Sequence, residues 1–160
     1  MTSAQCQMYR QISYNLYIAF ILHQRHTEQI LRDELNLSFS FFMILMAVDR
    51  DSVHCQKHIA TFLQLTPAAI SRQVNLLVKD KLIKRRVNAK NRREYSLELT
   101  DTGKQNLDKA YQALDRHRAK MLNDIACTDL DQLNNFLINL IAHLGPNDNP
   151  LLQFQQEGLN

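Results

Sequence analysis

Residues 66–103 read TPAAISRQVNLLVKDKLIKRRVNAKNRREYSLELTDTG. A threonine followed by proline opens this stretch, and that pair is typical of a helix start, because the hydroxyl caps the first turn and proline fits the first helical position. The apolar residues that follow are spaced four and three apart, as on one helix face, and they are Ile70, Val74 and Leu77. We therefore expect a helix from Pro67 to about Asp80 with an outer polar face.

The spacing of apolar residues changes to a period of two after this helix. Apolar and polar side chains alternate over residues 83–87 and again over 95–99, and the residues at 88–93 between these runs are polar and largely basic. Alternation on both sides of a polar, turn-forming segment is typical of a two-stranded hairpin. The sequence therefore predicts a hairpin with a basic tip.

Helices are predicted on both sides of this stretch. Capping residues mark three of their starts, namely Ser38, Thr100 or Asp101, and the pair Thr128 and Asp131. The expected helices cover residues 11–35, 39–48, about 53–63, 101 to about 125, and 128 to the stop at Gly145-Pro146. Residues 16–22 are apolar on every helix face, which predicts burial from more than one side.

Two short helices joined by a tight turn and followed by a hairpin predict a winged helix-turn-helix, with the small residue Ala60 where the helices cross. The fold class expected is mostly α with a small β-hairpin wing, flanked by long dimerisation helices. We divide the chain into a helical dimerisation module (1–36 and 104–145), a DNA-binding domain (37–103) and a loosely ordered tail (146–160).

The charge of the chain is unevenly distributed. The formal net charge is +3, yet the segment from Arg72 to Arg93 holds nine Lys or Arg and a single acid, Asp80. A basic centre in an otherwise acidic chain favours a localised surface that binds a polyanion. The alternative is a charged loop that is merely solvated.

The outer face of the second short helix carries the candidates for DNA contact. Small residues near its start let the backbone approach the major groove, and Arg72 can bind a guanine edge in bidentate fashion. Arginines at the hairpin tip can enter the minor groove or hold phosphates. The predicted DNA contacts are Thr66, Ala68, Ala69, Ser71, Arg72, Gln73, Asn75, Lys79, Arg86, Lys90, Arg92 and Arg93.

The stretch from Ile59 to Gly103 resembles the multiple-antibiotic-resistance regulator (MarR) family of bacterial transcription factors. That family has a wing motif Asp-x-Arg followed, six residues beyond the arginine, by Leu-Thr-x-x-Gly. Here Asn91-Arg92-Arg93 precedes Leu99-Thr100-Asp101-Thr102-Gly103 at the same spacing. The resemblance implies a triangular homodimer, with the helix from Pro67 as recognition helix and Arg93 as the minor-groove residue.

Two positions depart from the family pattern. The wing aspartate is replaced by Asn91, which can cap a turn but cannot form an ion pair that orients an arginine. The recognition helix of the family ends in Gly-Leu, whereas Lys81-Leu82 stands here. If Lys81 adopts a left-handed conformation, the backbone penalty is about 1 kcal/mol.

The helices outside the DNA-binding domain carry more apolar surface than one chain of this shape can cover. This favours a homodimer that reads a pseudo-palindromic site in double-stranded DNA, and an intramolecular core is the alternative. The predicted interface residues are Leu16, Phe20, Leu133, Leu137, Leu140 and Leu144. Small aromatic ligands are implied by the resemblance, and their candidate contacts, which are equally typical of plain core residues, are Tyr14, Tyr17, His23, Phe39 and Phe42.

Other classes of site are weakly supported. The three cysteines are far apart and form no CxxC pair, so neither a zinc site nor a disulfide framework is predicted. His54 and His58 alone have an i, i+4 spacing, and Cys55 cannot share their helix face. The longest apolar run, Phe39–Val48, is about half a membrane span, and no signal peptide is recognisable, so a soluble cytoplasmic chain without membrane contact is expected.

The sequence thus predicts a sequence-specific DNA-binding regulator, most simply a repressor relieved by a small ligand. No nucleophile–base pair, glycine-rich phosphate loop or carboxylate pair stands out, so no enzyme activity, cofactor or metal is expected. The alternatives are a protein-interaction module with the same fold and a regulator that senses redox conditions through a thiol. For the latter, Cys6 is a poor match, because the sensing cysteine of the relatives corresponds to a position near Tyr14.

Overall fold

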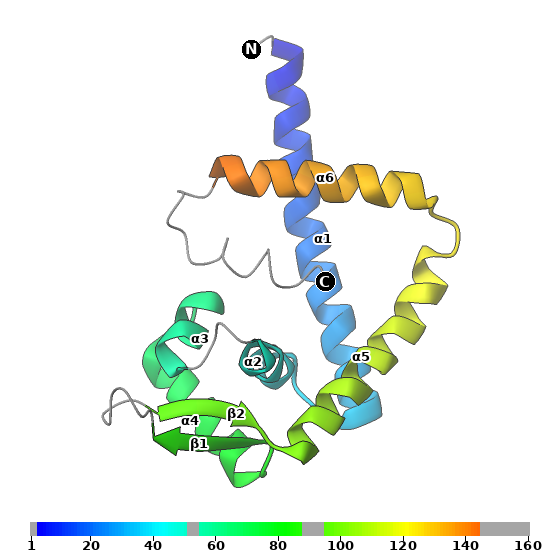
Figure 1. Cartoon of the computed structure of the whole chain (residues 1–160). Helices are drawn as coiled ribbons and strands as arrows, with labels where there is room; N and C mark the ends of the chain where they lie inside the picture. The colour runs from blue at the N-terminus through cyan, green and yellow to red at the C-terminus, as the bar shows by residue number, and fades with distance from the viewer. Residues whose placement is uncertain (1–2, 51–54, 88–94, 145–160) are drawn as a thin grey trace.

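The computed structural model describes residues 3–50, 55–87 and 95–144. Its elements, in chain order, are α1 (Ser3–Leu35), α2 (Phe39–Asp49), α3 (Gln56–Phe62), α4 (Pro67–Lys79), β1 (Ile83–Val87), β2 (Tyr95–Leu99), α5 (Asp101–Leu122) and α6 (Cys127–Leu144). Figure 1 shows α2, α3, α4 and the hairpin grouped at the C-terminal end of α1, with α5 leading away from the hairpin and α6 crossing the other half of α1.

The central element of the core is α2. Five of its residues are buried, namely Phe42, Ile44, Leu45, Ala47 and Val48. A short helix that is apolar on most faces needs neighbours on several sides, and α1, α4, α5 and β2 supply them. Its first turn is capped twice: the Ser38 hydroxyl accepts from the Phe41 N–H at 3.2 Å, and the Glu28 carboxylate of α1 accepts from the Phe39 N–H at 2.5 Å.

The helix-turn-helix follows the predicted pattern closely. Ile70, Val74 and Leu77 are fully buried, and Ala60 is buried where α3 packs on α4. The Thr66 hydroxyl accepts a hydrogen bond from the Ala69 N–H at 3.2 Å, and Pro67 is the first helical residue. The local signals at this helix start are therefore confirmed.

The hairpin is antiparallel and pairs Ile83 with Leu99 and Arg85 with Leu97. Ile83, Leu97 and Leu99 are buried, so this face of the hairpin covers the core. Side chains alternate across the sheet. Arg85 therefore lies on the core-facing side of β1, and Lys84 and Arg86 lie on the other.

A tight junction joins the end of α4 to the starts of β1 and α5. Lys81 has φ 59°, the left-handed conformation that the sequence comparison anticipated. Thr100 caps α5 by accepting from the Gly103 N–H at 3.0 Å. A β-carbon on Gly103 would lie 2.0 Å from the Leu82 carbonyl oxygen, so only glycine fits. The Leu-Thr-x-x-Gly motif thus has a steric and hydrogen-bonding basis.

Several predicted boundaries are wrong. Helix α1 begins at Ser3 rather than residue 11, and α5 ends at Leu122 rather than near residue 125. Helix α6 begins at Cys127, so Thr128 lies inside its first turn and not at the cap. The cap position falls on Ala126, whose carbonyl accepts from the Leu130 N–H at 3.3 Å. The helix therefore has its cap two residues earlier than the Thr–Asp pattern suggests.

The expected burial of residues 16–22 from several sides is not seen in the single chain. Tyr17 and Phe20 are each 63% exposed, and Leu22 is 57% exposed. Helix α6 likewise has no buried residue. None of the described helices combines the length and the apolar character needed to cross a membrane.

Candidate nucleic-acid interface

Helix α4 turns a polar face outward, opposite its buried apolar face. Among the predicted DNA contacts on and next to this helix, the exposed residues are Thr66, Ala68, Arg72, Asn75 and Lys79, and the half-buried ones are Ala69, Ser71 and Gln73. Because Ile70, Val74 and Leu77 anchor the helix to the core, the outer face is held at a fixed angle. A helix of this kind has the shape that fits a major groove.

Gln73 is engaged within the protein. The Ser40 hydroxyl of α2 donates to Gln73 Oε1 at 2.9 Å, across a partly buried contact. The side chain predicted to contact DNA is thus directed toward α2. Its neighbour Arg72 is exposed, with a side chain available to an external partner.

Arg86 also has a partner inside the protein. Its Nε lies 3.0 Å from Glu98 Oε2, and Lys84 Nζ lies 3.3 Å from the same oxygen. Both ion pairs are exposed, and such pairs contribute little stability. They nevertheless gather two cations and one carboxylate on the outer side of the hairpin, so the charge of Arg86 is partly neutralised there.

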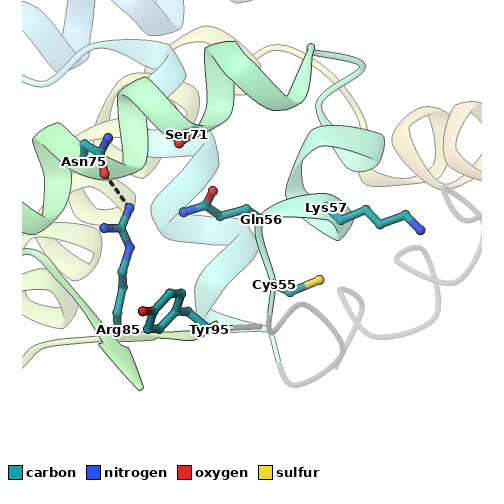
Figure 2. Close-up of a pocket in the computed structure, with 7 residues that line it drawn as sticks. All are labelled: Cys55, Gln56, Lys57, Ser71, Asn75, Arg85 and Tyr95. Atoms are coloured by element: carbon teal, nitrogen blue, oxygen red, sulfur yellow. Dashed lines mark hydrogen bonds between the residues drawn. The ribbon is translucent and has the colours of Figure 1, made fainter. Parts of the chain in front are cut away.

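Arg85 is a candidate interface residue that the sequence analysis missed. Its guanidinium Nη2 donates to Asn75 Oδ1 at 2.5 Å, and this bond links β1 to the outer face of α4. Figure 2 shows the Arg85 side chain running from the strand to Asn75, with the Tyr95 ring beside its stem. The alternation of 83–87 contained the signal, because it places Arg85 on the side of the hairpin that faces α4.

A cleft of about 390 Å³ lies between α3, α4 and the hairpin. Its lining residues are Cys55, Gln56, Lys57, Ser71, Asn75, Arg85 and Tyr95. Among these residues there are two cations and no carboxylate, so the cleft favours anionic groups. The Lys57 side chain extends away from the Asn75–Arg85 pair, which leaves Arg85 as the cation that faces the recognition helix (Figure 2).

Residues 35–94 match the MarR family in sequence. The match covers the helix-turn-helix and β1, and it spans fewer than half of the residues of the chain. Its fold is similar to that of the transcriptional regulator BldR from Sulfolobus solfataricus, with a TM-score of 0.69, 25% identity and coverage of 86% of this chain and 98% of that one. No curated protein matches the chain in sequence.

Two further solved structures share the fold of this chain. A MarR/EmrR family transcriptional regulator from Acinetobacter sp. ADP1 superposes with a TM-score of 0.70 at 19% identity, covering 86% of this chain and 96% of that one. A mutant of MepR from S. aureus, bound to an oligodeoxyribonucleotide, superposes with a TM-score of 0.57 at 20% identity, covering 84% and 98%. The predicted fold class is confirmed, and the resemblance to the MarR family is confirmed over residues 35–94.

The predicted wing tip lies outside the described residues. Lys90, Arg92 and Arg93, together with Asn91, fall in the segment 88–94, and His54 falls in 51–54. Their roles stay predictions from the sequence. Within the rest of the chain, no group of three or more His, Cys, Asp or Glu side chains is placed to hold a metal ion.

The five candidate ligand residues do not form one site in the single chain. Tyr14 and Tyr17 are 66% and 63% exposed on the half of α1 that points away from the DNA-binding domain. Phe42 is a core residue, 4% exposed, with its ring centroid 5.7 Å from that of Tyr111. Tyr14 is 14 residues before Glu28, which contacts Phe39, and this spacing corresponds to about 21 Å along a helix.

His23 and Phe39 lie on the helices that meet where α1, α2 and α5 come together. Partial burial lowers the pKa of His23 below its usual 6.5, and the positive charge of Arg118 and His26 lowers it further. Phe39 is half-buried and packs against Phe42, with a centroid distance of 6.5 Å.

Polar side chains join α1 to α5 near the DNA-binding domain. Glu34 of α1 accepts from Arg116 Nη2 at 2.5 Å and lies 2.9 Å from His117 Nε2. The hydrogen bond with His117, followed by the charge of Arg116, lowers the pKa of Glu34 below its usual 4.5. This cluster connects the base of the long helix α1 to the helix that leaves the wing.

An apolar groove of about 430 Å³ separates α1 from α6. It is lined by Ile12, Asn15, Leu16, Ala19, Leu133 and Phe136. Of the predicted interface residues, Phe20, Leu133 and Leu144 are 63%, 51% and 67% exposed, while Leu16, Leu137 and Leu140 are half-buried. Apolar surface of this extent is typical of an interaction site.

Proposed function

We propose that this chain is a sequence-specific DNA-binding transcriptional regulator that acts as a homodimer. The observation that carries the proposal is the two-sided character of α4, whose apolar face is fully buried while Arg72, Asn75 and Lys79 are exposed on the other. The basic strand β1 lies directly beside this polar face. Support also comes from the similar fold of the MepR mutant that was crystallised with an oligodeoxyribonucleotide.

We assign DNA binding and dimerisation to the two parts of the chain whose boundaries were expected from the sequence. Residues 37–103 bind DNA, and residues 1–36 with 104–145 form the dimer. A second copy is the proposed occupant of the apolar groove between α1 and α6, because the exposed Phe20, Leu133 and Leu144 continue the apolar surface on both of its walls. Two copies related by a two-fold axis would present two recognition helices to a pseudo-palindrome.

Selection of bound duplexes from a random DNA pool tests this function. We expect the chain to enrich an inverted repeat, with an affinity that falls steeply as salt concentration rises, because the Lys and Arg side chains displace counterions from phosphates. Enrichment of a single half-site without a repeat would refute the dimer. Failure to enrich any sequence would refute sequence-specific binding and favour the protein-interaction module.

We further propose that the regulator represses transcription and that a small ligand relieves the repression. The support is the family resemblance, together with the junction of α1, α2 and α5, where a bound molecule would contact both modules. A ligand that binds the DNA-free form more tightly than the DNA-bound form must raise the thermal stability of the free protein. The same difference in affinity must weaken DNA binding when the ligand is present. A set of small aromatic acids, assayed for both effects, tests this proposal, and a compound with neither effect is not the signal.

A further inference from the structure

The Asn75–Arg85 pair lies where the recognition helix meets the wing. We propose that Asn75 is a positioning residue that aims Arg85 at a DNA phosphate, and that it does not read a base itself. This inference rests on the proposed DNA-binding function and assigns a phosphate-binding residue that neither the basic tip nor the outer face of α4 had indicated.

The acceptor atom of Asn75 is directed at Arg85. An asparagine that reads adenine must donate from its amide nitrogen and accept with its amide oxygen at the same time. Here Oδ1 accepts from Arg85 Nη2 at 2.5 Å, and both side chains are exposed on the same face. The side chain is thus oriented by the arginine, and its oxygen points at the strand instead of outward from the helix.

Arg85 keeps most of its hydrogen-bonding capacity. A guanidinium has five N–H donors in a planar fork, and a single Asn75 contact leaves enough of them for a bidentate phosphate contact. In the part of the chain that the structure describes, Arg85 has no carboxylate within ion-pair distance, whereas its neighbours Lys84 and Arg86 share Glu98. The full charge of Arg85 is therefore available to an external anion.

The surroundings of Arg85 also favour an anion that is part of a larger ligand. The cleft that it lines is open and offers the hydroxyls of Ser71 and Tyr95 and the amide of Gln56. Ser71 and Asn75 are one helical turn apart on α4, so a group in this cleft lies against the recognition helix. A phosphate held there would set how deeply the helix enters the groove.

The salt dependence of binding separates positioning from base reading. The probes are a duplex enriched by the wild-type chain from a random pool and a shuffled duplex of the same composition. We expect Arg85→Ala to weaken binding to the enriched duplex roughly tenfold and to reduce the slope of log affinity against log salt by about 1. Asn75→Ala, although it removes no charge, should reduce the same slope, because it releases Arg85 from its phosphate.

The double variant and a charge-matched control complete the experiment. Asn75→Ala combined with Arg85→Ala should bind no worse than Arg85→Ala alone, because both remove one contact. Arg86→Ala removes an equal charge from the outer side of the hairpin and should have a smaller effect on affinity. Alanine is well tolerated at an exposed helix position, and thermal unfolding of each variant will verify folding.

The inference is overturned if Asn75→Ala weakens DNA binding but leaves the salt slope unchanged. It is overturned as well if the affinity losses of the two single variants add in the double variant, since Asn75 would then act independently as a base reader. It is also overturned if neither single substitution alters binding. Failure of the underlying function has a different signature, in which the wild-type chain enriches no duplex at all.

Discussion

The hydroxyl of Thr100 donates a hydrogen bond to the carbonyl oxygen of Lys81 at 2.6 Å, which ties the end of α4 to the start of α5. The hydroxyl oxygen of Thr100 also accepts from the Gly103 N–H at 3.0 Å, and the Thr100 N–H donates to the Leu82 carbonyl at 3.0 Å. Both ends of the hairpin are thereby fixed at one point. The angle of the wing relative to the recognition helix depends on this junction.

Gly103→Ala should destabilise the protein. The added β-carbon would lie 2.0 Å from the Leu82 carbonyl oxygen, and both partners are held by backbone hydrogen bonds. Forced overpacking of this kind costs about 1–3 kcal/mol. Urea denaturation measures the loss, and Lys104→Ala, on an exposed site in the same turn, should stay within about 0.5 kcal/mol of wild type. Equal stabilities of the two variants would contradict the steric account of this glycine.

Lys81→Gly should stabilise the protein by about 1 kcal/mol, because glycine adopts a left-handed conformation without the penalty that a β-carbon brings. The φ of Lys81 is 59°. Lys81→Ala is the matched control, since it removes the same charge and keeps the strained backbone. A gain in the urea midpoint for glycine but not for alanine would confirm the backbone origin, and similar gains for both would attribute the effect to charge.

Arg72→Ala should cost about 1–3 kcal/mol on the enriched duplex and relax base preference at one position in each half-site. Arg72 is exposed in the outer face of α4, between the fully buried residues Ile70 and Val74. Affinities on the enriched duplex and its single-base variants measure the effect. Lys79→Ala, at the far end of the helix, should weaken binding to all sequences alike. An equally uniform loss for Arg72→Ala would mean that it contacts phosphate.

Leu133→Glu should shift the protein from dimer to monomer without unfolding it. In the single chain this side chain is 51% exposed beside the groove between α1 and α6, so a charge is costly only when a second copy covers it. Sedimentation and thermal unfolding separate the two effects. Asn135→Glu introduces the same charge at another exposed position of α6 and should remain dimeric. A dimeric Leu133→Glu variant would place the interface elsewhere.

The stability contribution of Glu34 should depend on pH in a defined direction. Its pKa is lowered from 4.5 by the hydrogen bond with His117 and by the charge of Arg116. A carboxyl group whose pKa is lowered by folding contributes stability that is complete above its unfolded pKa and is lost as pH falls through the folded value. The difference in urea midpoint between wild type and Glu34→Gln should therefore be constant near about pH 7 and shrink below about pH 4.5.

A nearby carboxylate provides the comparison for Glu34. Asp33→Asn removes a charge from the adjacent position of α1, where the side chain is exposed. At neutral pH, we expect the urea midpoint of Asp33→Asn to differ less from that of wild type than the urea midpoint of Glu34→Gln does. If Glu34→Gln shows the same difference from wild type at all pH values, the junction of α1 with α5 does not depend on the ionised carboxylate.

The sequence by itself determined the local structure of the DNA-binding unit. The spacing of Ile70, Val74 and Leu77 predicted a buried helix face, and all three are fully buried. The alternation after Lys81 predicted the hairpin, and the Gly-Leu of the family at this position raised the left-handed conformation that Lys81 adopts. These features are set by side-chain periodicity, caps and backbone sterics within a few residues, which a sequence displays directly.

Only the tertiary structure decided which polar side chains face outward. Gln73 and Asn75 are equally polar in sequence, yet one is bonded to Ser40 of α2 and the other to Arg85 of β1. The exposure of Phe20 on α1 is likewise a property of the single chain that its apolar sequence did not predict. Such contacts join residues ten or more positions apart, so they depend on how whole elements pack, and periodicity within one element carries no information about its neighbours.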